Sequence, residues 1–248
     1  MLREPTIEKL HAMRMRVMAS TWLEQDKSPD TIALPFDDRF ALLVDAEMLA
    51  RENTRVAKNL RDAKLRISDA CIEGIEYARA RELEKATIRT LATCRWVSER
   101  QTVIITGATG TGKSYIACAL AHQACRRGFR AIYRRAPRLF SELKLARADG
   151  SHARLLAKLA KADVLVLDDF AIAPLSKDDR NDLLEILEDR YALRATIITS
   201  QLDSSNWHDH LGDPTVADAI CDRVLHGAHK LPLKGPSRRK PTKDSETP

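Results

Sequence analysis

Eight consecutive residues, Gly107–Ser114, have the sequence GATGTGKS, which is the spacing of a phosphate-binding loop. They lie between an apolar run, Val103–Ile105, and a helix-like segment that begins at Tyr115. A strand that turns through glycines into a helix directs several backbone N–H groups, and the positive end of the helix dipole, towards one point. The alternative is a glycine-rich turn that contains Lys-Ser by chance. The filled motif positions and the flanking elements favour a site for a nucleoside triphosphate.

Each part of this loop has an expected role. Lys113 would place its charge on the β and γ phosphates of the nucleotide, and the Ser114 hydroxyl would bind Mg²⁺. The residues expected to surround the phosphates are Gly107, Ala108, Thr109, Gly110, Thr111, Gly112, Lys113 and Ser114.

Two carboxylates, Asp168 and Asp169, follow the apolar run Val164–Leu167. The carboxyl end of a buried parallel strand emerges at the same sheet edge as the glycine loop. We therefore expect Asp168 to hold Mg²⁺, mostly through water, and Asp169 to polarise the attacking water. Taken alone, two aspartates after an apolar run could cap a turn. The upstream loop favours the functional interpretation.

Three further polar residues are candidates for the same chemistry. Gln201 ends a buried-strand pattern, and a strand beside that of Asp168 would bring it near the γ-phosphate. Arg223 and Arg239 have no obvious local reason for their positions, and an arginine from a lid or a neighbouring subunit can stabilise charge on a transferring phosphoryl group. The alternatives are an ordinary strand end and two exposed, salt-bridged arginines.

Short apolar strands alternate with helical segments after Gln101, which predicts an α/β fold with a parallel sheet. A helix is expected after Ser176, which has Asp179 three residues further on, the pattern of an N-terminal cap. The five expected strands are Thr102–Thr106, Arg130–Arg134, Val164–Asp168, Thr196–Ser200 and His229–Leu233.

The first 95 residues contain a single glycine, Gly74, and long helical periodicities, which predict a small all-helical domain. The expected domains are residues 1–95, a helical unit that binds DNA or a partner; 96–239, the nucleotide-binding domain; and 240–248, a disordered basic tail. The residues expected to form the core of the helical unit are Leu10, Met13, Val17 and Met18, and then Phe40, Leu43, Val44 and Leu49.

The net charge of +6 and the isoelectric point near 9.1 favour contact with a polyanion, although many basic proteins bind no nucleic acid. One basic helix face carries Arg51, Arg55 and Lys58, which could lie along a phosphate backbone or simply face solvent. The densest supply of arginine is Arg126, Arg127, Arg134, Arg135 and Arg138, and some of these bracket a buried strand and could be structural.

The five cysteines are scattered and include no CxxC pair, so we expect free thiols in a reducing cytosol. The N-terminal residues lack the apolar core of a signal peptide, and no uncharged run approaches the roughly 18 residues that span a bilayer. The sequence therefore predicts a cytoplasmic protein without a membrane partner.

Several motifs together resemble a known family. They are GATGTGKS, VLVLDD, IITSQ, the segment ADAICDRV at Ala217–Val224 and GPSRR near the C-terminus. This set is similar to AAA+ ATPases of the initiator and helicase-loader clade, and above all to the IstB-like ATPases that assist insertion-sequence transposition. The likeness extends to about residue 240. It implies a Walker A motif with Lys113 and Ser114 and a Walker B motif with Asp168 and Asp169.

The resemblance also implies roles for three residues outside these two motifs. Gln201 corresponds to sensor 1, Arg223 to the arginine finger and Arg239 to sensor 2. Three positions depart from the wider AAA+ pattern. Gln201 stands where Asn is frequent, Ala171 where Gly is frequent, and Pro236 enters the sensor 2 segment. Because Gln can still orient a water molecule, these departures do not predict an inactive enzyme.

The resemblance implies a Mg²⁺-dependent ATPase that forms a homo-oligomer on duplex DNA, remodels target DNA and recruits and stimulates a cognate transposase. The first alternative is a DnaC-like replicative helicase loader, whose helical unit would grip a helicase. A small-molecule kinase is a second alternative, against which the paired aspartates and the distant Arg223 argue. A third is a DNA architectural protein that binds ATP and scarcely hydrolyses it.

Overall fold

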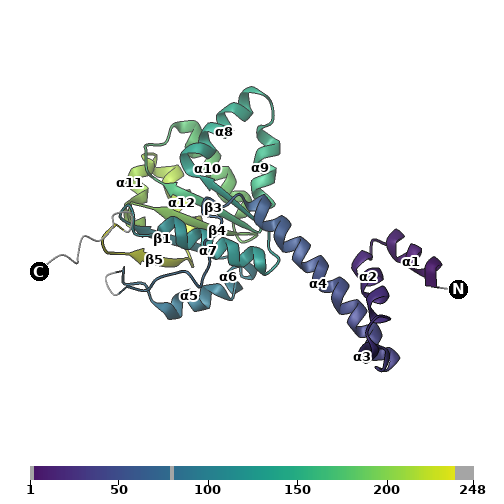
Figure 1. The fold of residues 1–248 in the computed structure, drawn as a ribbon. Helices are drawn as coiled ribbons and strands as arrows, with labels where there is room; N and C mark the ends of the chain where they lie inside the picture. The colour runs from purple at the N-terminus through teal and green to yellow at the C-terminus, as the bar shows by residue number, and fades with distance from the viewer. Residues whose placement is uncertain (1–2, 79–80, 238–248) are drawn as a thin grey trace, which may run out of the picture. The chain divides into compact units, whose positions relative to one another are not determined.

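The computed structural model describes residues 3–78 and 81–237, and the chain divides into two compact units between Lys58 and Asn59 (Figure 1). This division differs from the boundary near residue 95 expected from the sequence. Residues 59–95 belong to the second unit because they contribute Ala63, Ile75 and Leu91 to the core that covers its sheet.

The first unit contains α1 (Arg3–Ala12), α2 (Arg16–Gln25), α3 (Pro29–Ile32) and most of α4 (Phe36–Ala63). Its core is small and consists of Leu10, Met18, Ala19 and Leu43. Beside it, the Met18 backbone N–H donates a hydrogen bond of 3.0 Å to the Glu47 carboxylate.

Part of the core expected for this unit lies on its surface. Met13, Phe40, Val44 and Leu49 are exposed, with exposed fractions between 42% and 59%. A unit of fewer than 60 residues buries a limited share of its surface, and here the small core covers one side of α4.

The second unit is built on five parallel strands, which confirms the sheet predicted from the sequence. The strands are β1 (Thr102–Gly107), β2 (Ala131–Arg135), β3 (Val164–Phe170), β4 (Ala195–Ser200) and β5 (His229–Leu233). Their order in the sheet is β2-β3-β4-β1-β5, so that β3, β4 and β1 are central. The carboxyl ends of these three strands therefore meet at one edge.

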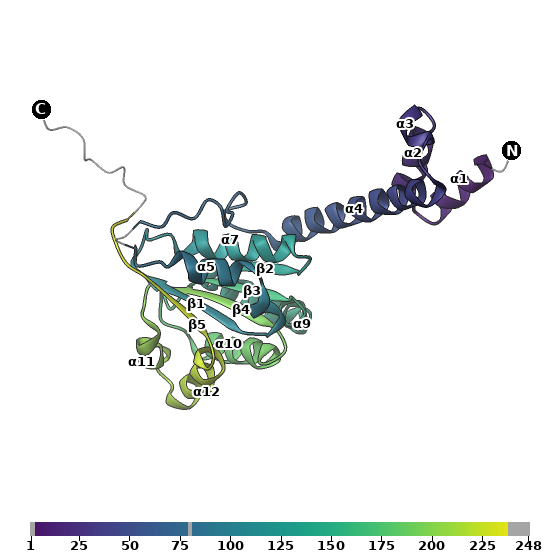
Figure 2. The same ribbon diagram turned by 90° about the horizontal axis from the view of Figure 1, so that it is seen from below.

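Helices cover both faces of this sheet (Figure 2). One face is covered by α5 (Lys85–Ala92), α6 (Arg95–Ser98) and α7 (Lys113–Arg126). The other is covered by α8 (Ala136–Ala148), α9 (His152–Ala160), α10 (Lys177–Arg190), α11 (Trp207–Leu211) and α12 (Pro214–Leu225), and a 3-10 turn, η2 (Ser204–Asn206), precedes α11. None of the helices in the described residues is both long enough and apolar enough to cross a membrane.

Strand alternation decides which side chains reach which helices. Val103 and Ile105 of β1 pack in the core under α7, whereas Ile104 between them packs in the core on the opposite face. In β3, Val164 and Val166 face α7, so the next residue of this series, Asp168, also points to that side. This alternation places a carboxylate beside the start of α7.

The ends of α10 are fixed by polar side chains. Ser176 and Asp179 form the expected capping box at its start. At its end the side chain of Arg190 is 1% exposed and donates hydrogen bonds to the carbonyl oxygens of Leu159 at 2.6 Å and Ala162 at 2.8 Å, and to that of Ala195. Arg190 thus satisfies backbone acceptors that burial would otherwise leave without donors.

All five cysteines are free thiols. Burial raises the pKa of Cys94, Cys118 and Cys125 to about 11. Cys71 and Cys221 are partly exposed.

Candidate active site

The glycine loop connects β1 to α7, as the sequence predicted, and two of its glycines are required by geometry. Gly112 caps α7 with a φ of +93°, in the left-handed region that favours glycine. A Cβ atom at Gly107 would lie 2.2 Å from the carbonyl oxygen of Leu233 in β5. The loop therefore approaches the end of β5 more closely than any side chain would allow.

A cavity of about 340 Å³ opens beside the loop. Its loop side is lined by Thr109, Gly110, Gly112, Lys113 and Ser114. The Lys113 ammonium donates hydrogen bonds to the carbonyl oxygens of Gly107 at 2.7 Å and Ala108 at 2.9 Å, which holds the cation over the loop.

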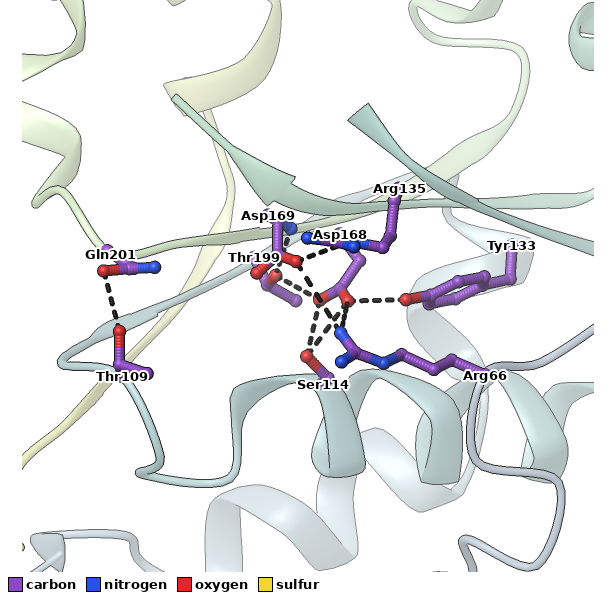
Figure 3. Close-up of polar contacts among 9 residues, drawn as sticks. All are labelled: Arg66, Thr109, Ser114, Tyr133, Arg135, Asp168, Asp169, Thr199 and Gln201. Carbon is purple, nitrogen blue, oxygen red and sulfur yellow. Dashed lines mark hydrogen bonds and ion pairs between the residues drawn. The ribbon is translucent and has the colours of Figure 1, made fainter. Parts of the chain in front are cut away.

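Asp168 is fully buried and is surrounded by hydroxyl donors (Figure 3). Its carboxylate accepts hydrogen bonds from the Ser114 hydroxyl at 2.9 and 3.0 Å, from the Tyr133 hydroxyl at 2.5 Å and from the Thr199 hydroxyl at 2.5 Å. Tyr133 and Thr199 come from the strands on either side of β3. Three elements thus fix this carboxylate against the first turn of α7.

Asp169 adopts a left-handed backbone conformation with a φ of +59°, next to an irregularity in the pairing of β3 with β4 between Leu167 and Phe170. Regular alternation would turn this side chain to the opposite face of the sheet. Instead its carboxylate accepts a hydrogen bond of 2.8 Å from Nε of Arg135, and its backbone N–H donates one of 3.0 Å to the Thr199 hydroxyl. Both aspartates therefore lie at the same edge, as predicted.

Arg66 is the cation that bridges the two aspartates. Its Nη1 atom lies 3.5 Å from Oδ2 of Asp168 and 3.6 Å from Oδ2 of Asp169. Burial and the adjacent Asp168 carboxylate raise the pKa of the Tyr133 hydroxyl, so Tyr133 remains a hydrogen-bond donor here. No sequence pattern indicates this contact, because Arg66 lies 102 positions from Asp168.

Gln201 lines the cavity, and its side-chain oxygen accepts a hydrogen bond of 2.8 Å from the Thr109 hydroxyl (Figure 3). The structure thus brings Gln201 to the glycine loop, as its predicted role requires. The Ser114 hydroxyl and the Asp168 carboxylate supply the hard oxygen donors that Mg²⁺ prefers. These residue types fit the metal that the fold implies.

The far side of the cavity comes from the segment between α4 and α5, which sequence reasoning missed. It is lined by Ile67, Gly74, Glu76 and Tyr115 of α7. A Cβ atom at Gly74 would lie 2.2 Å from the Tyr115 hydroxyl, so the lone glycine among the first 95 residues was the available signal.

Arg81 fastens this segment to the glycine loop. Its guanidinium donates hydrogen bonds to the carbonyl oxygens of Thr111 at 2.9 Å and Glu76 at 2.6 Å. The Arg81 carbonyl accepts one of 3.2 Å from the backbone N–H of Lys234, after β5.

Arg223 lies away from the cavity. It donates a hydrogen bond of 2.8 Å to the carbonyl oxygen of Ala219 and forms an ion pair with Glu188. With Thr102 and Thr196 it lines a separate cavity at the amino ends of β1 and β4, which is the edge opposite the glycine loop. Arg239 lies outside the described residues, as does the expected tail, 240–248.

The basic face expected in the first unit is exposed. Arg51 has a side chain that is 57% exposed and pairs with Glu47 at 2.8 Å, and Arg55 and Lys58 are exposed as well. Together with Arg14 and Arg16, which the sequence did not single out, they line a cavity of about 410 Å³.

The arginines expected to contact DNA from the second unit differ in their surroundings. Arg126 and Arg127 are exposed at the end of α7, and Arg126 pairs with Glu73 at 3.5 Å. Arg134 is largely buried, with a side chain 13% exposed that pairs with Glu142 at 3.1 Å. Arg135 pairs with Asp169, whereas Arg138 is 81% exposed.

Comparison with known proteins matches nearly the whole chain. The family model described as IstB-like ATP binding protein matches residues 8–246. A putative insertion sequence ATP-binding protein, y4pL, from Sinorhizobium fredii is 43% identical over 240 residues, 97% of this chain and 98% of that protein. The insertion sequence IS1162 putative ATP-binding protein from Pseudomonas fluorescens is 44% identical over 205 residues, 83% of this chain and 89% of that protein.

Solved structures with a similar fold match about two thirds of this chain. The crystal structure of DnaI has a TM-score of 0.58 and 23% identity, and the match covers 67% of this chain and 92% of that one. The crystal structure of the DnaC helicase loader has a TM-score of 0.56 and 23% identity, covering 67% of this chain and 97% of that one. The sheet order and these likenesses identify an AAA+ P-loop fold.

Proposed function

Because this chain belongs to the IstB-like ATP-binding protein family, we propose that it is an ATP-hydrolysing regulator of DNA transposition that works in the cytoplasm. It assembles into a homo-oligomer on duplex DNA, remodels the target site and recruits and stimulates a transposase. The support comes from the active-site geometry, from the basic surfaces and from relatives whose names place them in insertion sequences.

ATP would bind to groups that already lie close together at the glycine loop. The backbone N–H groups of the glycine loop and the start of α7 would surround the phosphates. Lys113 would exchange the Gly107 and Ala108 carbonyls for oxygens of the β and γ phosphates. Ser114 and Asp168 would hold Mg²⁺, which when bound neutralises charge that develops on the phosphate oxygens.

Hydrolysis requires a proton acceptor beside the γ-phosphate, and Asp169 lines the cavity. The attacking water forms a bond to the γ-phosphorus while the bond to the bridging oxygen breaks, and its proton passes to the Asp169 carboxylate. Gln201 would orient this water through its amide. To accept the proton, Asp169 must first lose its 2.8 Å contact with Arg135.

Assembly explains the position of Arg223. Since it lies at the sheet edge opposite the glycine loop, it can reach a γ-phosphate only when that phosphate is bound by another copy of the chain. An arginine supplied in this way would stabilise the transition state and make hydrolysis depend on the oligomer.

DNA binding would use the exposed basic residues of both units, above all Arg51, Arg55 and Lys58 of α4 and Arg138 of α8. Each phosphate contact releases counterions, so affinity should fall steeply with salt. Bending a short duplex costs roughly 1 to 6 kcal/mol, which an array of such contacts can offset.

One observation carries this proposal: the Ser114 hydroxyl lies 2.9 Å from the Asp168 carboxylate beside Lys113, in a chain that matches an insertion sequence ATP-binding protein over 97% of its length. The test measures ATP turnover and particle mass with and without duplex DNA. We expect both to rise together with DNA. A monomer whose turnover ignores DNA would refute the proposal.

Two variants make that test specific. Lys113→Ala should weaken nucleotide binding and abolish assembly on DNA while its circular dichroism spectrum stays unchanged. Asp169→Asn should keep nucleotide binding and lose turnover by about a hundredfold or more, as expected when a general base is removed. Equal, negligible turnover in Asp169→Asn and in the unaltered protein would show that the chain binds ATP without hydrolysing it.

The helicase-loader alternative is separated by partner capture. A tagged chain that retains a transposase on ATP-loaded DNA would support our proposal. Recovery of a replicative helicase without a transposase would favour the helicase-loader alternative. The support for that alternative is the similarity in fold to the DnaC helicase loader.

A further inference from the structure

A second cavity, of about 330 Å³, opens beside the two aspartates and is lined almost entirely by cations. Lys64 and Arg66 come from the segment after α4, Arg134 and Arg135 from the end of β2, and Arg138 from the first turns of α8. Glu142 is the one carboxylate among these lining residues. All of these groups belong to the second unit.

The cations of this cavity outnumber the carboxylates that pair with them. Glu142 accepts contacts from Nε of Arg134 at 3.1 Å and from Nε of Arg138 at 3.4 Å. Arg66 pairs with Asp168 and Asp169, and Arg135 pairs with Asp169. Five cations thus share three carboxylates, and the excess of positive charge is one that an anion would stabilise.

Arg66 belongs both to this cavity and to the Asp168 site. Its guanidinium lies 3.5 Å from Asp168 and 3.6 Å from Asp169 (Figure 3). The Arg66 side chain also lines the cavity and is 38% exposed. Asp168 itself is 0% exposed. The cation over this buried carboxylate is thus within reach of a ligand that enters from solvent.

The charge and shape of the cavity favour phosphate groups. Guanidinium groups form paired hydrogen bonds with phosphate oxygens. Because the cavity is open to solvent, it can accept a phosphate that remains part of a polymer. A phosphodiester backbone presents such anions in series, and Arg138, which lines the cavity, is 81% exposed and accessible to such a chain.

We propose that this cavity binds a phosphate of duplex DNA and that Arg66 couples its occupancy to metal binding at Asp168. The proposal rests on the function proposed above, that the chain binds ATP with Mg²⁺ and binds DNA. A phosphate in the cavity draws Arg66 away from Asp168 and leaves that carboxylate to the metal. In the same way, a metal at Asp168 repels Arg66 and leaves it to the DNA.

Because Asp168 and the DNA phosphate compete for Arg66, the metal and the DNA should bind with positive cooperativity. Linkage requires that DNA tighten metal binding by the same factor by which metal tightens DNA binding. Coupling between sites typically amounts to about 5- to 150-fold, and a change of at least about fivefold is expected here.

The experiment measures both affinities on the full chain, with Mn²⁺ as the metal and a non-hydrolysable ATP analogue present. Electron paramagnetic resonance gives the free Mn²⁺ with and without a short duplex, and fluorescence anisotropy gives duplex affinity with and without Mn²⁺. In Arg66→Gln we expect tighter Mn²⁺ binding in the absence of DNA and a coupling factor near one. Arg154→Gln removes an exposed arginine from α9, on the other face of the sheet, and should retain the coupling.

A second variant tests the cavity without touching the aspartates. Lys64→Gln combined with Arg138→Gln should weaken duplex binding and reduce the slope of affinity against salt by about two, since each lost phosphate contact removes about 0.9. An unchanged slope would show that DNA does not enter the cavity.

The remaining outcomes separate the proposals. If the unaltered chain binds neither nucleotide nor duplex, the proposed function itself fails. If it binds both without coupling, or if Arg66→Gln keeps the coupling, the inference about Arg66 is wrong. If millimolar inorganic phosphate tightens Mn²⁺ binding as much as DNA does, the cavity is a site for small anions and the assignment to DNA is overturned.

Discussion

Replacing Tyr133 by phenylalanine should destabilise the second unit through one buried hydrogen bond. The Tyr133 hydroxyl donates to the Asp168 carboxylate at 2.5 Å, and Asp168 is 0% exposed. The substitution removes one oxygen and leaves the ring in place, so packing against the sheet should be preserved. The substitution therefore mainly removes the hydrogen bond from the neutral Tyr133 hydroxyl to the buried Asp168 carboxylate.

The magnitude follows from that chemistry. Hydrogen bonds to charged groups contribute about 1.5 to 3 kcal/mol, and neutral ones about 0.5 to 1.5 kcal/mol. Asp168 retains the Ser114 and Thr199 hydroxyls and Arg66, so the expected loss lies near the lower end, about 1.5 to 2 kcal/mol. For a unit of this size, each kcal/mol lowers the melting temperature by about 2 to 4 °C.

The assay is urea unfolding followed by circular dichroism, arranged as a double-mutant cycle with Asp168→Asn. With a neutral acceptor, the cost of Tyr133→Phe should fall by about 1 kcal/mol. Tyr191→Phe is the matched control, because this side chain is 47% exposed and its loss should cost less than about 0.5 kcal/mol. Equal costs of Tyr133→Phe in both backgrounds would refute the interaction with the carboxylate charge.

Three further outcomes are expected. Gly112→Ala should weaken binding of an ATP analogue, measured by calorimetry, by about tenfold. The reason is that φ is +93° at this position and that the new Cβ atom would lie 2.7 Å from a guanidinium nitrogen of Arg81. Unchanged affinity would contradict the strained geometry. Arg190→Met should lower the free energy of unfolding by at least about 3 kcal/mol, because it leaves buried carbonyl oxygens without hydrogen-bond donors. Arg194→Met is the control and should cost little, because the Arg194 side chain is 43% exposed. Cys94, Cys118 and Cys125 should react slowly with a thiol reagent until the chain unfolds, because a thiol of pKa about 11 is only about one part in a thousand thiolate at pH 8. Their reaction should become faster as the pH rises. Simultaneous reaction of all five cysteines in the folded protein would contradict this burial.

The sequence was sufficient wherever function depends on local pattern. The apolar runs around Ile104 and Val166 predict buried strands, and the parallel arrangement brings their carboxyl ends together. For that reason the sequence alone could place the glycine loop, Asp168 and Gln201 at one edge of the sheet.

The residues that sequence reasoning missed come from irregular segments. Arg66 and Arg81 act through side chains that cross from the segment between α4 and α5 to the sheet and the glycine loop. No periodicity governs such segments, so neither contact has a sequence signal. The division after Lys58 differs from the boundary expected near residue 95 for another reason: helical periodicity at Ile88 and Leu91 does not reveal which unit covers the apolar face.

The left-handed backbone at Asp169 limits which replacements can be interpreted. Asparagine tolerates a φ of +59°, whereas alanine in this conformation costs roughly 1 to 2 kcal/mol. An alanine variant would therefore mix the loss of a proton acceptor with a shift of the strand end that also carries Asp168. Asparagine preserves the shape of the site and changes its chemistry alone, which makes Asp169→Asn the suitable form for capturing the ATP-loaded assembly for imaging.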